Sequence, residues 1–228
     1  MWGGQAEGIG LRDRSLFCSC YDWLVKRFSR FKYLVGVDEA GRGPLAGPVA
    51  VGAVVIKAED YAQIKRFFAG AGDSKQLSPE RRDYWFRQLL VAKRAGSLDF
   101  CVSFSGQTAI DCLGIVPAIA RALARSLQRL SSPPAESLIL LDGSLRAPSQ
   151  FTNQQTIIRG DESELLIGLA SIAAKVSRDR LMIRADRRWP GYGFVDHKGY
   201  GSQSHYAAIS RLGLCPLHRR SFLKNIAK

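Results

Sequence analysis

Two β-branched runs, separated by a stretch rich in glycine and proline, constrain this chain more than any other feature. The runs are "YLVGVD" (33–38) and "VAVGAVVI" (49–56), and "EAGRGPLAGP" lies between them. β-Branched residues favour strands, and glycine and proline favour turns. We therefore expect two adjacent antiparallel strands joined by a long turn.

Further along the chain, predicted strands alternate with predicted helices. One helix starts with Ser78 as its N-cap and Pro79 in its first turn, and Pro190 ends another. The alternation indicates an α/β fold with a mixed β-sheet flanked by helices, and the polar, basic tail predicts a small C-terminal helical cap. The remaining strands are expected at 98–105, 137–143 and 155–161, and the helices at 78–96, 115–130 and 163–189.

The charge balance narrows the range of partners. Lys and Arg outnumber Asp and Glu by 33 to 20, a net charge of +13, which fits binding to phosphate backbones, although a general surface charge would give the same count. No apolar run is long enough to cross a bilayer and the N-terminus lacks a secretory pattern, so we predict a cytoplasmic protein with no membrane partner. The five cysteines lack the spacing of a zinc site or a disulfide framework.

Acidic residues end three of the predicted strands. Asp38 and Glu39 follow the first strand, and Asp142 and Asp161 end two later ones. The carboxyl ends of strands in an α/β sheet form the crevice where ligands bind. Carboxylates gathered there repel one another unless a cation joins them, and an all-oxygen ligand set selects Mg²⁺ or Mn²⁺. Two such ions about 4 Å apart would suit phosphodiester cleavage.

Any one of these acids, taken alone, is more typical of an ordinary turn or cap residue than of a metal ligand. Successive residues of a strand point to opposite faces, so Glu39 is expected where the first strand turns away from the sheet. The four acids together in a basic chain favour the metal site.

The glycine-rich turn excludes two familiar phosphate-binding motifs. A dinucleotide fingerprint requires glycine where Ala46 stands, and a Walker loop requires Gly-Lys-Ser/Thr, which is absent. Gly41 and Gly43, with Arg42 between them, instead suit a turn whose backbone closely approaches a ligand.

Eight short motifs occur in order along the chain: "GVDEAGRGPLAGPV", "DSKQLS", "LLDG", "IIRGD", "ASIAAKVSRDRLM", "PGYGF", "HKGYGS" and "HRRSF". By these motifs the chain resembles ribonuclease HII, the bacterial type 2 ribonuclease H, from about Tyr33 to Phe222. The Gly-Arg-Gly turn distinguishes it from ribonuclease HIII. The chain departs from the family at "AIDCLGI" (109–115), where Ala109 and Gly114 replace polar residues, and "RGD" replaces the commoner Lys-Gly-Asp.

The resemblance implies a ribonuclease H-like fold and an endonuclease that cuts the RNA strand of RNA–DNA hybrids and also cuts at a single ribonucleotide within duplex DNA. Cleavage on the 5′ side of the ribonucleotide would leave a 3′-hydroxyl and a 5′-phosphate, with two Mn²⁺ or Mg²⁺ ions bound. Asp179 is a competing fourth acid that we expect in an ion pair with its arginine neighbours. The catalytic metal ligands by motif matching are Asp38, Glu39, Asp142 and Asp161.

The resemblance also implies how the substrate is read. The turn formed by Gly41, Arg42 and Gly43 would contact the 2′-hydroxyl at an RNA-to-DNA junction, and Tyr200 would pack against the sugar there. The three histidines, at 197, 205 and 218, are expected in structural or phosphate contacts. The candidate phosphate contacts are Lys75, Lys175, Arg178 and Lys198.

We expect a monomer with three parts: an N-terminal extension (1–31), a catalytic core (32–190) and the cap (191–228). Two alternatives remain open at this point. One is another two-metal phosphoryl-transfer enzyme on a similar fold, such as ribonuclease HIII or a resolvase-like nuclease. The other is a non-catalytic protein that binds hybrids.

Overall fold

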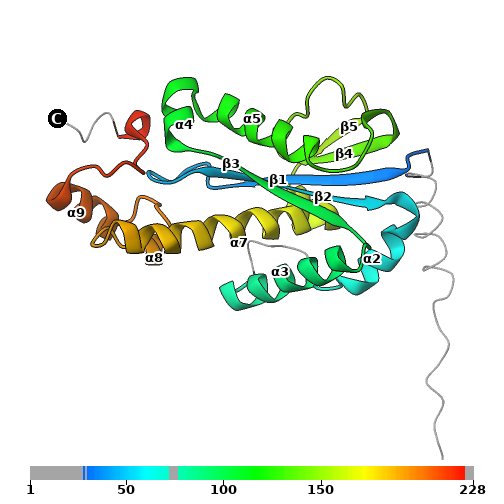
Figure 1. Ribbon diagram of the computed structural model, residues 1–228, viewed down its shortest axis with the longest axis horizontal. Coiled ribbons are helices and arrows are strands. Elements are labelled where there is room, and N and C mark those ends of the chain that lie inside the picture. The colour runs from blue at the N-terminus through cyan, green and yellow to red at the C-terminus, as the bar shows by residue number, and fades with distance from the viewer. Residues whose placement is uncertain (1–27, 29, 72–76, 224–228) are drawn as a thin grey trace, which may run out of the picture.

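The computed structural model describes residues 28, 30–71 and 77–223, which form a mixed β-sheet covered by helices (Figure 1). The strand order is β3-β2-β1-β4-β5. β1 pairs antiparallel with β2 and parallel with β4, which confirms the predicted antiparallel pair and the mixed sheet. The strands are β1 (Tyr33–Ala40), β2 (Val49–Lys57), β3 (Asp99–Ser105), β4 (Ser137–Asp142) and β5 (Gln154–Ile157).

Helices lie on both faces of the sheet: α4 and α5 on one face, and α2, α3 and α7 on the other (Figure 1). The three long helices were predicted, and Ser78 caps α3 by accepting a hydrogen bond from the backbone N–H of Arg81. The long helices are α3 (Pro79–Arg94), α5 (Ile115–Gln128) and α7 (Leu165–Arg188). The shorter ones are α2 (Tyr61–Phe67), α4 (Gln107–Leu113), α6 (Gly160–Ser163), α8 (Phe194–His197) and α9 (Gln203–Leu212), with 3₁₀ turns at Ala58–Asp60, Pro134–Glu136 and Arg220–Phe222.

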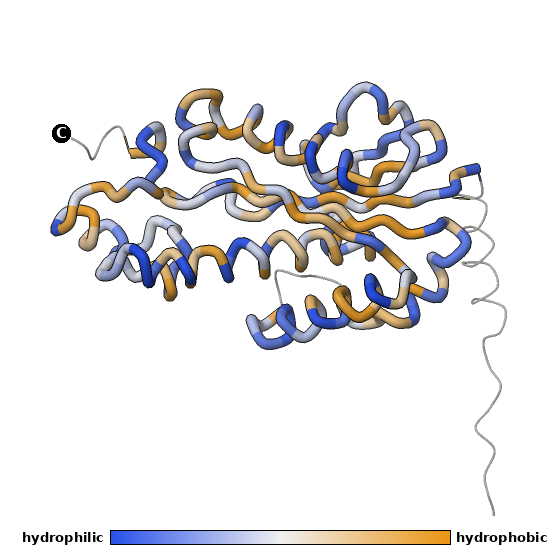
Figure 2. The backbone as a smooth tube through the Cα atoms, viewed as in Figure 1, coloured by the Kyte–Doolittle hydropathy of each residue, from blue (hydrophilic) through white to orange (hydrophobic). Residues whose placement is uncertain are grey.

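The sheet separates two hydrophobic clusters. Leu34 of β1 packs in the cluster on the α7 side, whereas Val35 and Val37 pack in the cluster on the α5 side. Figure 2 shows hydrophobic residues concentrated along the central strands. Because both faces are covered, the central strands β1, β2 and β4 are nearly continuous in apolar residues.

Two strand glycines allow α7 to lie directly on the sheet. A Cβ added at Gly36 would stand 2.2 Å from the backbone of Leu166, and one at Gly52 would stand 2.2 Å from the carbonyl oxygen of Ala170. Neither clash could be relieved by a side-chain rotation, because the obstructing atoms are backbone. This close approach brings Ser171 and Arg178 of α7 to the carboxyl end of β1.

The cap packs on the C-terminal half of α7, where α8 and α9 lie beyond one end of the sheet (Figure 1). Met182 and Ala185 of α7 share a buried cluster with Tyr192, Phe194 and other side chains of the cap. Within the described part of the chain, none of the helices combines the length and the apolar character needed to span a membrane.

Two predicted strand ends are wrong. β5 ends at Ile157, and Asp161 lies four residues later in the short helix α6. β1 continues through Glu39 to Ala40, because β2 goes on pairing with it, with Glu39 opposite Val51. Glu39 therefore does not lie where the strand leaves the sheet.

Candidate active site

Asp38 and Asp142 lie side by side at the carboxyl ends of two parallel strands. The register of β1 and β4 pairs Val37 with Leu141, and the two acids are the next residues on their strands. Equivalent positions of neighbouring strands share a face, so both carboxylates belong to the α7 side of the sheet. Asp38 is only 3% exposed, whereas Asp142 is half-buried.

Glu39 lies just beyond the point where β1 and β4 stop pairing. Its carboxylate is half-buried, and Oε1 is 3.4 Å from Nη1 of Arg42, the middle residue of the Gly-Arg-Gly turn. The strand alternation places Glu39 on the opposite face from Asp38. β1 still pairs with β2 at Glu39 but no longer with β4, so the Glu39 carboxylate can turn toward Asp38 past the end of β4. Glu39 thereby links the acids to the turn.

Asp161 reaches the same place by a different route from the predicted one. After β5 the chain turns through Arg159, whose φ of 52° is left-handed, and enters α6. The backbone N–H of Gly160 donates a 2.7 Å hydrogen bond to Oδ1 of Asp142, which fixes the next residue, Asp161, close to that carboxylate. Asp161 is 1% exposed. A helix start, and not a strand end, positions this acid.

The pKa values of Asp38 and Glu39 are raised. Burial is the main reason why the pKa of Asp38 rises to about 8. A hydrogen bond from Ser171 opposes the rise, and the charges of Glu39 and Asp142 add to it. Burial also raises the pKa of Glu39, where the Arg42 guanidinium opposes the rise and Asp142 adds to it. The site therefore concentrates negative charge that a bound cation would stabilise.

The donor chemistry fits a hard divalent cation. The four acids offer only oxygen atoms, the ligands that Mg²⁺ and Mn²⁺ prefer. Among the residues that the structure describes, however, no three His, Cys, Asp or Glu side chains stand close enough to form a ready metal cluster. The backbone brings the acids together, and their side chains would have to turn inward to hold an ion.

The two glycines of the Gly-Arg-Gly turn differ in what they require. Gly41 has a φ of +89°, and an added Cβ would stand 2.0 Å from Nε of Arg178, so the fold itself demands glycine there. Gly43 is exposed, has no left-handed φ, and an added Cβ would meet nothing within 4 Å in the described chain. The missing side chain at Gly43 leaves open space beside the acids.

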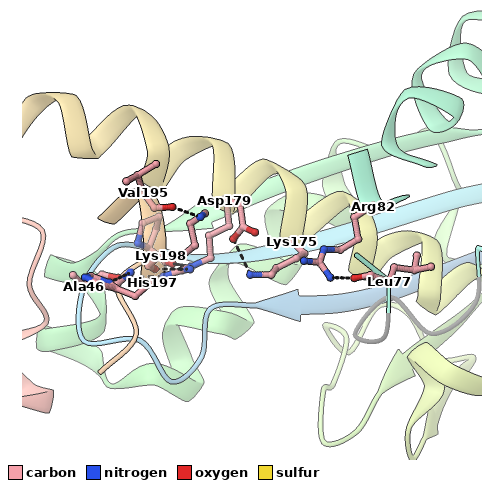
Figure 3. A network of polar contacts seen from close by, with 11 residues as sticks. Ala46, Leu77, Arg82, Lys175, Asp179, Val195, His197 and Lys198 are labelled. Atoms are coloured by element: carbon pink, nitrogen blue, oxygen red, sulfur yellow. Dashed lines mark hydrogen bonds and ion pairs between the residues drawn. The ribbon is translucent and has the colours of Figure 1, made fainter. Parts of the chain in front are cut away.

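Tyr200 and Lys175 lie near this turn. Tyr200 is 44% exposed, and its ring centroid is 5.9 Å from Nζ of Lys175. Lys175 also makes a 2.8 Å ion pair with Asp179 (Figure 3). The ion pair expected for Asp179 is therefore present, but its partner is Lys175, one helical turn away, whereas its neighbour Arg180 pairs with Asp83.

The other residues predicted to contact phosphates lie in different surroundings. Lys198 is half-buried, and its ammonium donates to the carbonyl of Val195 (Figure 3). Lys75 lies outside the described residues. The expected phosphate contact from Arg178 is wrong in this arrangement, because its side chain is fully buried and its guanidinium bonds three backbone carbonyls.

Sequence reasoning assigned no role to Arg219 of the "HRRSF" motif or to Ser171 of α7. Arg219 is fully buried beneath the Gly-Arg-Gly turn, and Ser171 hydrogen-bonds the Asp38 carboxylate. Only the shared motif "HRRSF" pointed toward Arg219, since a buried arginine and a surface arginine look alike in sequence.

Comparisons with known proteins show which family the chain resembles. A family model described as Ribonuclease HII matches residues 35–225. The chain is 43% identical over 210 residues to the ribonuclease HII of Geobacter metallireducens, covering 92% of this chain and 91% of that one. It is also 43% identical to the ribonuclease HII of Ruminiclostridium cellulolyticum, covering 87% of this chain and 72% of that one.

Solved structures share the fold. The ribonuclease H2 of Pyrococcus horikoshii OT3 superposes with a TM-score of 0.68 at 25% identity, covering 86% of this chain and 97% of that one. A Bst-RNase HIII solved in complex with Mn²⁺ has a TM-score of 0.60 at 18% identity, covering 90% of this chain and 73% of that one, which shows the fold alone.

Proposed function

Because this chain belongs to the ribonuclease HII family, whose members cleave the RNA strand of RNA–DNA hybrids, we propose that it also incises duplex DNA at single embedded ribonucleotides. Cleavage would fall on the 5′ side of the ribonucleotide and leave a 3′-hydroxyl and a 5′-phosphate. The family establishes that the chain is a ribonuclease. We propose its incision at single ribonucleotides, its metal ligands and the identity of the metal ions.

The convergence of acids from separate segments at one end of the sheet carries the proposal. Asp38 and Asp142 end neighbouring parallel strands, and the Gly160 amide ties Asp161 to Asp142. Burial of Asp38 beside other carboxylates destabilises the protein unless a cation is bound. A carboxyl group whose pKa is strongly raised by burial and by neighbouring carboxylates is typical of a catalytic centre.

We infer that Asp38, Glu39, Asp142 and Asp161 hold the metal ions, Mg²⁺ or Mn²⁺. Two bound ions would stabilise the attacking and leaving oxygens of the phosphodiester. The protein's own contribution is to hold the carboxylates in one crevice. The Ser171 hydroxyl and the Glu39 amide bond Asp38 and set its orientation, and the Gly160 amide does the same for Asp142.

The turn of Gly41, Arg42 and Gly43 would recognise the ribose. The open space at Gly43 admits a sugar to within backbone contact, where peptide groups can bond a 2′-hydroxyl, the group that distinguishes RNA from DNA. The exposed Tyr200 ring would pack on the neighbouring deoxyribose. Lys75, Lys175 and Lys198 would contact phosphates.

A single set of substrates tests the function. The purified protein is offered a DNA duplex with one ribonucleotide, a continuous RNA–DNA hybrid and an all-DNA duplex, each with Mg²⁺ or Mn²⁺. We expect incision of the first two and none of the third. Cutting of the hybrid alone would favour an activity like that of ribonuclease HIII, and binding without cutting would indicate a non-catalytic hybrid-binding protein.

Tyr200→Ala tests the recognition element separately. We expect it to impair cutting at the lone ribonucleotide more than on the continuous hybrid, where other contacts compensate. The measurement is the pair of cleavage rates relative to the unsubstituted protein. Equal fractional losses on both substrates would assign Tyr200 to support of the fold.

We further propose that the protein acts as a monomer in the cytoplasm. Residues 32–190 would form the catalytic core, residues 191–228 the cap that carries Tyr200, and residues 1–31 an N-terminal extension to which no role is assigned.

A further inference from the structure

Two fully buried arginines lie beneath the Gly-Arg-Gly turn. Arg178 comes from α7 and Arg219 from the segment after α9, and both side chains are 0% exposed. In the described residues neither guanidinium makes an ion pair with a carboxylate within 4 Å. Buried charges normally require a partner, so their hydrogen bonds have to offset the loss of water.

All six of their hydrogen bonds go to backbone carbonyls. Arg219 donates to the carbonyls of Gly41 (2.6 Å), Arg42 (2.9 Å) and Gly47 (2.9 Å). Arg178 donates to those of Pro48 (2.9 Å), Ala46 (3.1 Å) and Lys198 (3.0 Å).

Five of the six carbonyls belong to the turn between β1 and β2. Their oxygens point inward to the guanidiniums, so the turn is held by two side chains more than by pairing of its own backbone. The backbone around it adds a few bonds: Gly199 accepts from Leu45 and Ala46, and Gly47 donates to Leu217. In Figure 3, Ala46 lies beside His197 and Lys198 near the end of α7.

Arg178 connects the turn to the Tyr200 segment. Arg178 bonds the carbonyl of Lys198, and its guanidinium carbon is 5.7 Å from the centre of the Tyr200 ring. The segment that carries Arg219 is held by α4, because Asp111 of α4 accepts hydrogen bonds from the backbone N–H groups of Arg220 and Ser221. The turn and the Tyr200 segment therefore share one rigid support that reaches both faces of the sheet.

We propose that Arg178 and Arg219 are positioning residues that fix the Gly41–Gly43 turn and Tyr200 as a single unit, and that this unit sets selectivity for the lone ribonucleotide. The inference rests on the proposed function. Neither arginine touches the substrate; each acts through the carbonyls that it holds. Lysine cannot replace them, because one ammonium lacks the planar fork that reaches several carbonyls at once.

Arg219→Lys and Arg178→Lys test this inference, since both keep the charge and remove the fork. Arg125→Lys is the matched control: Arg125 also bonds a backbone carbonyl, that of Phe104, but from α5 on the other face of the sheet. For each protein we would measure kcat and KM on the lone-ribonucleotide duplex and on the continuous hybrid, the melting temperature, and binding of an all-DNA duplex.

We expect the kcat of each arginine variant to fall about tenfold or more on the lone-ribonucleotide duplex, because the turn and Tyr200 would no longer hold the ribonucleotide in place. On the continuous hybrid we expect kcat to fall only a few-fold. Binding of the all-DNA duplex should be unchanged, because the charge is retained. Arg125→Lys should keep the selectivity of the unsubstituted protein.

Equal losses on both substrates would overturn the proposal and leave the arginines a general structural role, as would failure of both variants to fold. Unchanged selectivity in folded variants would overturn it as well. If the unsubstituted protein does not incise the lone-ribonucleotide duplex, the proposed function fails first, independently of the arginines.

Discussion

At the scale of single residues, we expect Asp38 to be needed for cleavage and to destabilise the metal-free protein. Burial raises its folded pKa to about 8 from 3.8, so its favourable contribution is complete below pH 3.8 and is lost as the pH rises through 8. Asp38→Asn should therefore raise the melting temperature of the metal-free protein at pH 8, and by less toward pH 4. Cleavage should fall about 10³-fold or more. Thermal melts and cleavage rates provide the two measurements.

Metal titration supplies the control for Asp38. Added Mg²⁺ or Mn²⁺ should raise the melting temperature of the unsubstituted protein by binding only its folded state, and should raise that of Asp38→Asn much less. A variant that keeps a tenth of the normal cleavage rate would remove Asp38 from the site.

Asp161 and Asp179 are the two candidates for the fourth acid. Asp161→Asn should be folded and nearly inactive, because Asp161 is buried beside Asp142. Asp179→Asn should remain active and lose less than about 1 kcal/mol of stability, because its ion pair with Lys175 is partly exposed. Cleavage rates and urea unfolding of both variants decide the matter, and the reverse pattern would make Asp179 the ligand.

At the scale of elements, the contact of α7 with β2 determines where the site forms. Gly52→Ala places a Cβ 2.2 Å from the Ala170 carbonyl oxygen, so α7 has to shift. We expect a loss of about 1–3 kcal/mol in the free energy of unfolding, together with a loss of cleavage. Gly106→Ala is the control, since its Cβ meets nothing within 4 Å in the described chain. Equal stability of the two variants would contradict this account of the packing.

The cap contains a histidine chain that depends on pH. Cys215 N–H donates to His218 Nδ1, which leaves Nε2 of His218 to donate to His205 Nε2 at 3.1 Å, and Nδ1 of His205 to donate to the Tyr200 carbonyl. This arrangement requires neutral rings, and His197 stacks on His205 with ring centroids 4.3 Å apart. Burial lowers the pKa of His205 to about 4 and also lowers that of His218.

Because the pKa of His205 is lower in the folded protein than the unfolded value of 6.5, His205 stabilises the folded protein above pH 6.5. This stabilisation is lost as the pH falls toward 4. The free energy of unfolding should therefore decrease across this window, by up to about 1.4 kcal/mol per pH unit for each histidine. His205→Gln should be less stable at pH 7 but show a flatter pH dependence. Urea unfolding between pH 7 and 4.5 measures both; identical slopes would mean that His205 does not titrate with folding.

At the scale of the whole molecule, the net charge of +13 predicts binding that is driven by phosphates and weakened by salt. Affinity for an all-DNA duplex should fall linearly on a log–log plot against salt, with a slope of about −0.9 per neutralised phosphate. Lys198→Gln should reduce the slope by about one. Lys57→Gln should not, because Lys57 lies at the opposite end of β2 from the acids. Equal slopes for all three proteins would remove Lys198 from the interface.

Much of this architecture follows from local pattern. The β-branched runs at 33–38 and 49–56 form β1 and β2, and Ser78 and Pro79 start α3 where predicted. The ends of strands were harder to predict from the sequence, because a strand continues for as long as its neighbour pairs with it. Glu39 stays in β1 since Val51 lies opposite, and β5 stops at Ile157, so Asp161 falls in α6.

The amino-acid sequence by itself determined the β1–β2 pair, the three long helices, the family and the candidate acids, because periodicity, turn residues and motifs are local. The short helices α2, α4 and α6 were not predicted. Only the tertiary structure decided which basic side chains are buried. Arg178 is fully buried and bonds carbonyls, whereas Arg180, two residues later, is exposed and pairs with Asp83. Arg219 is buried beneath the turn, and its neighbour Arg220 is exposed. Burial depends on what distant segments bring to a residue, and here those segments are the β1–β2 turn, α7 and the cap.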